Sequence, residues 1–438
     1  MKRVFKIGEA DGFIAHSGKS EYKIRLLPEA GEAEHYAAEE LARIVNMASG
    51  AEMEITYENF SPAIHIGCGK KPQITEVTRN GFVIKTIGRD VYIDAPNTSG
   101  LIYGVYRLME LVAGYMYYAP DETAIGESVE FRQLEILDFP DFLNRDIFNF
   151  DTKEFPDNAM RLYTTGSNYS AWAPKYGEGS WWSSLHDQSL CFQLLDWRIY
   201  REKFPDWYYG KYDGDPINFR PQLCYTRVLY DRDKFEKGDW SEENYNDGRH
   251  GSFWTLVYNL VNNYIAVEKD KSLFQLGMSD NYEFCDCEQC RKDVEKYSRS
   301  GVALRLANAI ADEVEKWRLE NCPERQIYLT MFAYACIVNP PTKIVDGKHV
   351  PLDESVIARD NLLIRYAPIG DYYMFPLLDK EHNPGAYNAL MGWSTVAKHF
   401  AVWDYRVDFG SLIAPFPQWM AAAENIRTYY KFGFVDVF

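Results

Sequence analysis

Two carboxylates three residues apart, Asp280 and Glu283, are the side chains whose type and spacing best fit catalysis. They follow an apolar run with one glutamine, residues 273–278, which is typical of a strand buried on both faces of a parallel sheet. Ser279, Asp280 and Asn281 favour a turn, because their side chains hydrogen-bond the local backbone. Two acids on one loop can serve a single reacting centre. The alternative is that Asp280 caps a turn and Glu283 is solvated.

Three cysteines follow these acids with the spacing Cys-x-Cys-x2-Cys: Cys285, Cys287 and Cys290. Thiolates bind zinc, and a fourth ligand could come from elsewhere, such as Cys336 or Cys224. Because no second pair at a known spacing follows, the spacing alone indicates zinc only weakly. We therefore expect a buried, reduced cluster that braces the loop, with no metal and no cofactor.

Other candidates lie at the ends of two further apolar runs. Tyr334 ends one, and the triplet Trp403, Asp404 and Tyr405 ends another. A tyrosine hydroxyl can hydrogen-bond an amide or a sugar hydroxyl, and Trp403 could form the floor under a sugar ring. The alternative is a core tryptophan beside a structural aspartate. His186 could contact substrate from an aromatic-rich insertion, although a lone histidine is more often structural.

The composition limits the classes of molecule that the chain is expected to bind. Its 438 residues are enough for two domains, and 46% hydrophobic and 25% charged residues are ordinary for a globular protein. The formal net charge of −17 argues against a nucleic-acid backbone or an anionic membrane as partner. Aromatic residues make up 16%, which suits polyhydroxylated ligands, although large aromatic cores give the same number.

The expected location follows from what the sequence lacks. No apolar run approaches the roughly 20 residues that cross a bilayer, and residues 1–9 lack the apolar stretch of a secretory signal. The eight cysteines are then expected to be reduced thiols in a cytoplasmic protein. Removal of a signal from a precursor would instead make the protein secreted or periplasmic.

Two domains are expected to position the candidate residues. Residues 1–135 predict an α/β accessory domain, with helices at 34–47 and 101–112 and a hairpin over 82–94. Residues 140–438 alternate strand-like and helix-like segments, the pattern of a (β/α)8 TIM barrel whose catalytic residues follow the strands. Eight strands are expected at 143–149, 167–172, 222–225, 273–280, 327–334, 361–366, 399–405 and 434–438. The chain then ends at strand eight, as a fragment or a barrel closed in another way.

The N-terminal half resembles a small domain of known glycosidases. The similar runs are GFVIK at 81–85, VYIDAPNTSGLIYGVYRLME at 91–110 and GYMYYAP at 114–120. This domain precedes the catalytic barrel in β-N-acetylhexosaminidases of glycoside hydrolase family 20 and in α-glucuronidases. There it packs against the barrel and is not catalytic, so the resemblance implies a glycosidase architecture without indicating the substrate.

The C-terminal half resembles the bacterial "domain of unknown function 4838" proteins, from which the family 163 endo-β-N-acetylglucosaminidases were drawn. The similar residues are His186 with Cys191, the runs 204–208 and 222–224, the turn 279–281 with the cysteines of 285–290, and the runs 403–405 and 415–417. The turn combined with the cysteines is the most distinctive of these. The resemblance implies that the substrate is a β-linked glycan containing N-acetylglucosamine.

The resemblance also implies a mechanism. In family 20 enzymes the substrate's own 2-acetamido oxygen attacks the anomeric carbon, an aspartate orients that amide, and an adjacent glutamate donates the proton. Asp280 and Glu283 would take these two roles, with retention of configuration, and Asn281 would contact substrate with His186, Tyr334 and residues 403–405. The sequence departs from the family 20 pattern, because Asn281 stands where the glutamate would be.

Two other functions stay open. A glycosidase that removes uronic acids would need a cation for the substrate carboxylate, and Arg365 and Arg406 near strand ends are the candidates. A catalytically silent glycan-binding protein would keep the aromatic residues and lose the acid, a possibility that Asn281 keeps open.

Overall fold

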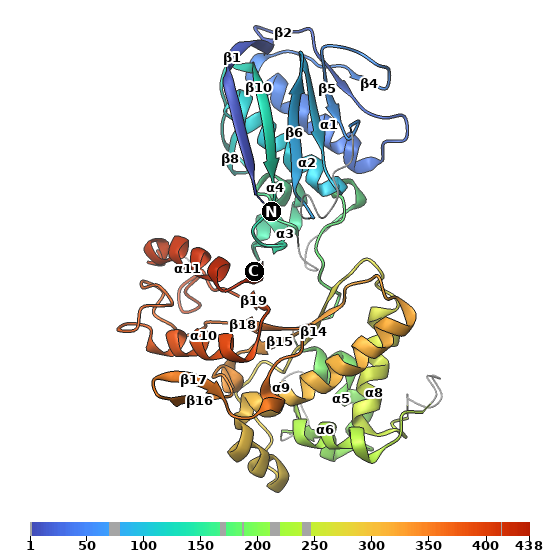
Figure 1. Cartoon of the computed structure of the whole chain (residues 1–438), viewed down its shortest axis with the longest axis vertical. Helices are drawn as coiled ribbons and strands as arrows, with labels where there is room; N and C mark the ends of the chain where they lie inside the picture. Colours follow the sequence, from blue (N-terminus) through green and yellow to red (C-terminus); the bar gives the residue numbers. More distant parts are fainter. Residues whose placement is uncertain are drawn as a thin grey trace. The chain divides into compact units, whose positions relative to one another are not determined.

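The computed structural model describes residues 2–69, 79–166, 172–185, 188–210, 220–238, 247–412 and 414–438. The chain divides into two compact units, Met1–Ser180 and Trp181–Phe438 (Figure 1). Residues 140–180, which the sequence assigned to the barrel, group with the first unit in this division. The roles of the two domains stay predictions. Among the described residues, no helix combines the length and apolarity needed to cross a membrane.

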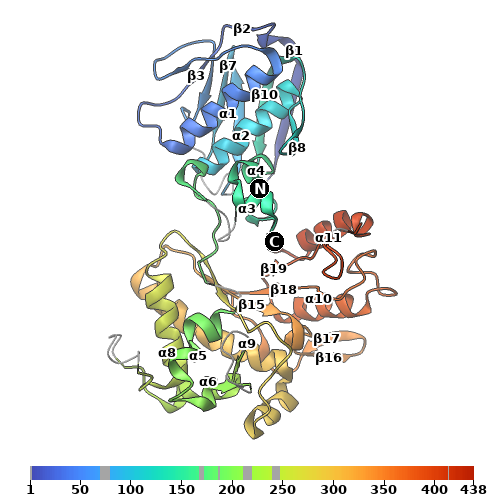
Figure 2. The same ribbon diagram turned by 180° about the vertical axis from the view of Figure 1, so that it is seen from behind.

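An eight-stranded sheet forms the first unit, in the order β2-β1-β10-β6-β7-β5-β3-β4. Its strands are β1 (Val4–His16), β2 (Lys19–Ser20), β3 (Lys23–Arg25), β4 (Ile55–Thr56), β5 (Ala63–Ile66), β6 (Phe82–Ile87), β7 (Asp90–Asp94) and β10 (Ser128–Asp138). Helices α1 (Glu32–Ser49) and α2 (Thr98–Ala113) cover one face of this sheet (Figure 2). Both helices and the antiparallel β6–β7 hairpin confirm the sequence prediction.

Smaller elements complete the first unit. These are β8 (Met116–Ala119), β9 (Glu122–Ala124), β11 (Asn144–Arg145), α3 (Phe150–Glu154) and α4 (Pro156–Arg161). Within the first strand predicted for the barrel, residues 143–149, the two residues of β11 form a strand, and β11 belongs to the same six-stranded sheet as the five strands of the second unit that lie between residues 273 and 437. The second, residues 167–172, falls almost entirely on residues 167–171, which lie outside the described part of the chain.

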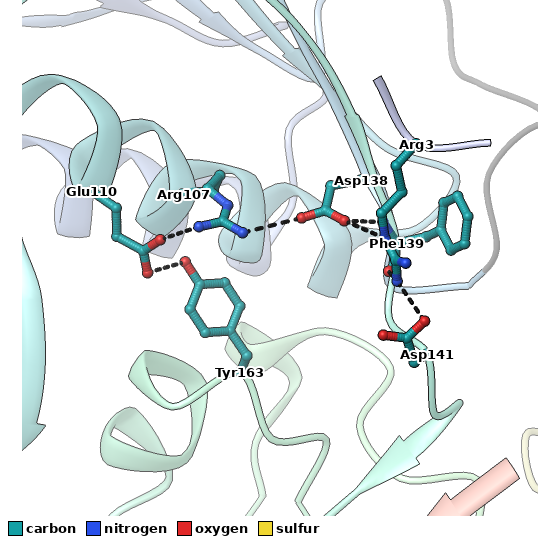
Figure 3. A network of polar contacts seen from close by, with 7 residues as sticks. All are labelled: Arg3, Arg107, Glu110, Asp138, Phe139, Asp141 and Tyr163. Atoms are coloured by element: carbon teal, nitrogen blue, oxygen red, sulfur yellow. Dashed lines mark hydrogen bonds and ion pairs between the residues drawn. The ribbon is translucent and has the colours of Figure 1, made fainter. Parts of the chain in front are cut away.

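A polar network ties the segment after β10 to the first unit (Figure 3). Arg107 in α2 donates to Glu110 at 2.7 Å and to Asp138, the last residue of β10, at 3.3 Å. Arg3 donates to the other oxygen of Asp138 at 3.0 Å. Tyr163, which follows α4, donates its hydroxyl to Glu110 at 2.6 Å. These bonds explain why residues beyond the predicted boundary belong to this unit.

A parallel sheet forms the centre of the second unit, in the order β14-β15-β18-β19-β20. The strands are β14 (Leu273–Leu276), β15 (Tyr328–Ala333), β18 (Leu362–Tyr366), β19 (Phe400–Val402) and β20 (Phe434–Val437). Trp182 adds an isolated parallel bridge to Leu273. Predicted strands four to eight are therefore confirmed, and the sheet is a half-barrel of an α/β protein.

Helices and a hairpin connect these strands. They are α9 (Glu288–Asn321), interrupted at Ser298, whose φ is +67°, then α10 (Pro384–Val396) and α11 (Trp419–Lys431), with the hairpin β16 (Thr342–Val345) and β17 (Lys348–Pro351) between β15 and β18. Before β14 lie α5 (Trp197–Tyr200), β12 (Tyr208–Tyr209), β13 (Gln222–Leu223), α6 (Tyr225–Lys234) and α8 (Gly251–Leu260). The prediction for residues 222–225 was wrong, because β13 pairs antiparallel with β12 instead of joining the barrel sheet.

Candidate functional site

The carboxyl ends of the parallel strands bring an acid and a tyrosine together. Asp280 follows β14, and Tyr334 follows the neighbouring strand β15 directly. The hydroxyl of Tyr334 donates a hydrogen bond to Asp280 Oδ1 at 2.9 Å. Burial raises the pKa of Tyr334, and the bond to Asp280 raises it further, so the hydroxyl remains a donor at neutral pH. Asp280 is exposed and Tyr334 is half-buried.

Gln222 of β13 holds the loop that follows β14. Its Nε2 donates to the carbonyl of Ser279 at 2.8 Å and to Asn281 Oδ1 at 2.9 Å, and its Oε1 accepts from the Ser279 N–H at 3.2 Å. Asn281 also accepts from the Glu283 N–H at 2.9 Å and donates to the carbonyl of Arg220 at 2.6 Å. The side chain of Asn281 therefore braces the loop, which gives a structural reason for its presence there.

Glu283 is exposed, and its backbone is held on both sides. Its N–H donates to Asn281, and its carbonyl accepts from the Cys336 thiol at 3.5 Å. The role of Glu283 as proton donor stays a prediction. His186 lies outside the described residues.

A buried arginine lies among the aromatic side chains of the same half-barrel. The guanidinium carbon of Arg365 is 4.0 Å from the ring centre of Trp182 and 4.7 Å from that of Trp403. Its Nη1 donates to Gln275 Oε1 at 3.3 Å, and the residue is only 4% exposed. Arg365 therefore packs against the rings of Trp182 and Trp403, and the ring centre of Trp403 also lies 4.3 Å from that of Phe438.

The side chain of Asp404 forms a buried ion pair. Its side chain, 7% exposed, pairs with Arg406 Nη2, and its Oδ1 accepts from the Tyr405 N–H at 2.8 Å. Arg406 also donates to Gln418 Oε1 at 3.1 Å. Burial raises the pKa of Asp404 although Arg406 opposes the shift. Contact of Asp404 or Tyr405 with substrate stays a prediction.

Sequence reasoning missed one acid at this edge, Asp371, which follows β18. It is half-buried, and Tyr366 Oη donates to its Oδ2 at 3.4 Å. Burial raises its pKa to about 6; Tyr366 opposes this shift, and the charge of Asp404 adds to it. Because β15 separates β14 from β18, the strands that carry Asp280 and Asp371 lie roughly 10 Å apart. The rule that acids follow strand ends could have found Asp371.

Four cysteines beside the same loop are the metal-binding candidates of the described residues: Cys224, Cys285, Cys287 and Cys290. Cys285 and Cys287 come from the loop itself, Cys290 lies in the first turn of α9, and Cys224 lies between β13 and α6. The sequence named three of them as one motif and Cys224 as one of two possible fourth members.

Several solved glycoside hydrolase structures are similar to the chain. A β-N-acetylhexosaminidase from Bacteroides fragilis NCTC 9343 is 13% identical, with a TM-score of 0.41 over 91% of this chain and 73% of that one. A family GH115 4-O-methyl-α-glucuronidase is 12% identical, with a TM-score of 0.46 over 96% and 54%. A mutant β-hexosaminidase from Streptomyces plicatus, in complex with its product GlcNAc, is 16% identical, with a TM-score of 0.24 over 32% and 26%.

The chain thus spans about half the length of the glucuronidase. The match to the Streptomyces plicatus mutant covers about a third of this chain and about a quarter of that one. No curated protein matches its sequence. Residues 250–438 match the family described as "Domain of unknown function (DUF4838)". The similarity that the sequence motifs indicated is therefore confirmed over residues 250–438.

Proposed function

We propose that the protein is a glycoside hydrolase that cleaves β-linked glycans containing N-acetylglucosamine, by an acetamido-assisted, retaining route. The observation that best supports this is the 2.9 Å hydrogen bond between Tyr334 and Asp280. It lies at the carboxyl edge of a parallel sheet, where barrel enzymes place their catalytic groups. The family match over residues 250–438, to which the sequence resemblance points, is the second support.

An aspartate acceptor beside a tyrosine donor complements an amide. The 2-acetamido group offers one N–H donor and one carbonyl acceptor, which Asp280 and Tyr334 can bind side by side. A carboxylate that accepts the N–H makes the carbonyl oxygen more nucleophilic. That oxygen then attacks the anomeric carbon as the leaving oxygen takes up a proton, and water later opens the cyclic intermediate with retention of configuration.

Two carboxyl groups are candidates for the proton donor. Glu283 is the one that the sequence resemblance implies. Asp371 is supported by its environment, because a pKa near 6 keeps a fraction of the carboxyl protonated close to neutral pH, as a general acid requires. Both assignments are proposals. Variants of each carboxyl group, assayed on substrates that differ in their leaving group, distinguish them.

Removal of uronic acids finds less support in the site. Arg365 is buried between two tryptophans and bonded to Gln275, and Arg406 is paired with Asp404. A substrate carboxylate would have to compete with these contacts. We therefore keep N-acetylglucosamine as the proposed specificity.

A pair of substrates with the same leaving group tests the proposal. Aryl β-N-acetylglucosaminide and aryl β-glucoside differ only in the acetamide, and an N-glycan with a β-linked N-acetylglucosamine core extends the test to larger substrates. We expect hydrolysis of the acetamido substrates alone. Equal hydrolysis of the β-glucoside would overturn the acetamido route. Binding of the glycans without any hydrolysis would establish the silent glycan-binding alternative.

A further inference from the structure

Four cysteine sulfurs converge beside the loop that carries Asp280. The Sγ atoms of Cys224, Cys285, Cys287 and Cys290 all lie within 4.8 Å of one another. Cys224 Sγ is 3.4 Å from Cys290 Sγ and 4.0 Å from Cys287 Sγ. In a tetrahedral zinc site with Zn–S bonds of about 2.3 Å, sulfurs are about 3.8 Å apart. The observed separations bracket that spacing.

We propose that these four cysteines bind a single structural zinc ion. Four protein thiolates around a tetrahedral ion are the ligand set of closed, structural zinc sites. Cys336, the other fourth ligand that the sequence allowed, lies outside the four-cysteine group and donates its thiol to the Glu283 carbonyl. The sequence had favoured a cluster without metal, because the spacing of three cysteines could not reveal that Cys224 joins them.

The backbone around the cysteines favours negatively charged sulfur. Cys287 caps the N-terminus of α9, and its Sγ accepts a hydrogen bond from the Cys290 N–H at 3.4 Å. Helix N-termini stabilise thiolates through their unpaired N–H groups and dipole. A divalent cation would neutralise the charge that such thiolates carry in a mostly buried position.

The ion would tie the C-terminal end of the candidate catalytic loop to the end of β13. Cys224 directly follows β13, whose Gln222 holds Ser279 and Asn281, while the other three ligands follow Asp280 in the chain. Zinc would therefore join the start of α6 to the start of α9 and hold the loop between β14 and α9 that carries Asp280. This role does not depend on which reaction the protein performs, and metal content can be measured without an activity assay.

Zinc content compared between two matched variants tests the proposal. We expect purified wild-type protein to carry one zinc ion per chain by mass spectrometry of metals, and Cys336→Ser to keep it. Cys224→Ser should lose most of the zinc. With cobalt(II) in place of zinc, wild type and Cys336→Ser should show the intense charge-transfer and ligand-field bands of tetrahedral tetrathiolate coordination. Loss of metal from Cys336→Ser together with its retention by Cys224→Ser would overturn the ligand assignment.

Thiol alkylation of wild-type protein keeps the test independent of how the variants fold. Cys287 is exposed, so an alkylating reagent should modify it readily in metal-free protein. Added zinc should protect all four cluster cysteines and leave Cys336 as reactive as before, as peptide mass spectrometry would show. Equal modification of Cys287 with and without zinc would overturn the proposal, as would a disulfide between Cys224 and Cys290 in protein prepared with zinc.

Discussion

At the scale of single residues, the proposed function depends on the pair of Asp280 and Tyr334. A carboxylate and a phenol 2.9 Å apart form an acceptor and a donor whose spacing suits one amide. Neither side chain is deeply buried, so both can exchange their mutual hydrogen bond for contacts with a substrate. Their value to catalysis should therefore exceed their value to stability.

Tyr334→Phe tests this balance. We expect kcat on an aryl β-N-acetylglucosaminide to fall roughly 100-fold, a size typical of losing a preorganised hydrogen-bond donor. The free energy of unfolding should change by less than about 1 kcal/mol, because the lost hydrogen bond is partly exposed. Tyr118→Phe, at a tyrosine that is 62% exposed in β8, is the matched control and should leave kcat unchanged. An unchanged kcat in Tyr334→Phe would remove the tyrosine from the mechanism.

Asp371 gives the site an expected pH dependence. A proton donor acts in its protonated form, and burial raises the pKa of this carboxyl to about 6. If Asp371 is the donor, kcat/KM should be high at acidic pH and fall as the pH rises through about 6. Asp371→Asn should lose that decline and slow substrates with poor leaving groups most. The same behaviour in Glu283→Gln, with Asp371→Asn unaffected, would assign the donor to Glu283.

At the scale of elements, a buried carboxylate joins the helices of the first unit. Glu40 of α1 accepts from Arg43 at 2.6 Å, from Arg161 of α4 at 3.2 Å and from the hydroxyl of Tyr106 in α2 at 2.9 Å. Burial alone would raise the pKa of Glu40, but the two arginines outweigh it and lower the pKa to about 2. The folded state therefore favours the ionised carboxylate.

The pKa of Glu40 predicts how stability depends on pH. Because it lies below the ordinary value of 4.5, its contribution is complete above about pH 4.5 and is lost as the pH falls towards 2. A shift of this size corresponds to about 3 kcal/mol. Glu40→Gln should lower the free energy of unfolding by about that amount at pH 7.

Denaturant titrations at several pH values measure this contribution. The difference between wild type and Glu40→Gln should shrink steadily below pH 4.5. Glu39→Gln, at the exposed neighbouring position, should match wild type throughout. A constant difference between wild type and Glu40→Gln down to pH 2 would contradict the assigned pKa.

The approach of α2 to the sheet depends on a glycine. A Cβ at Gly104 would lie 2.6 Å from Ile93 Cγ2 of β7, closer than real contacts allow. We expect Gly104→Ala to reduce the free energy of unfolding by about 1–3 kcal/mol through overpacking. Gly385→Ala in α10 is the control, because a Cβ there meets nothing within 4 Å and should stabilise by up to about 1 kcal/mol. Equal effects of the two substitutions in thermal unfolding would contradict the tight packing.

Element prediction succeeded where local pattern decides the structure. Strands β14, β15 and β18 are mostly apolar runs, each with one polar residue, because both faces of a parallel sheet are covered, and the sequence shows them directly. Strand β1, in contrast, is mostly exposed and lacks a clear apolar alternation, and the sequence reading missed it. Strand β13 was recognised as a strand, but its antiparallel pairing with β12 depends on tertiary packing, which the local pattern does not show.

In the candidate site, too, the sequence predicted what local pattern determines and missed what contacts between distant segments determine. Asp280 and Tyr334 were predicted together because both follow strands of one parallel sheet. The bracing of Asn281 by Gln222, and the choice of Cys224 over Cys336, depend on contacts between segments far apart in the chain. No periodicity in the sequence encodes such contacts.

At the scale of the whole molecule, an acidic chain of 438 residues combines a mixed-sheet unit with a parallel half-barrel unit. Its net charge of −17 makes neutral glycans more suitable partners than polyanions. The candidate catalytic residues, the aromatic stack around Arg365 and the cysteine cluster all lie in the second unit. The match to the DUF4838 family lies entirely within that unit.

The most direct test of the central claim is the rate of hydrolysis of aryl β-N-acetylglucosaminides whose acetyl methyl group carries zero to three fluorine atoms. Fluorine withdraws electrons from the amide oxygen and leaves the aryl leaving group unchanged. If the acetamide is the nucleophile that Asp280 and Tyr334 position, kcat of the wild-type protein should fall progressively with each fluorine. A rate that is the same for all four substrates would contradict the acetamido-assisted mechanism. Failure to hydrolyse any of the four substrates or the N-glycan would contradict the proposal that the protein is a glycoside hydrolase of this specificity.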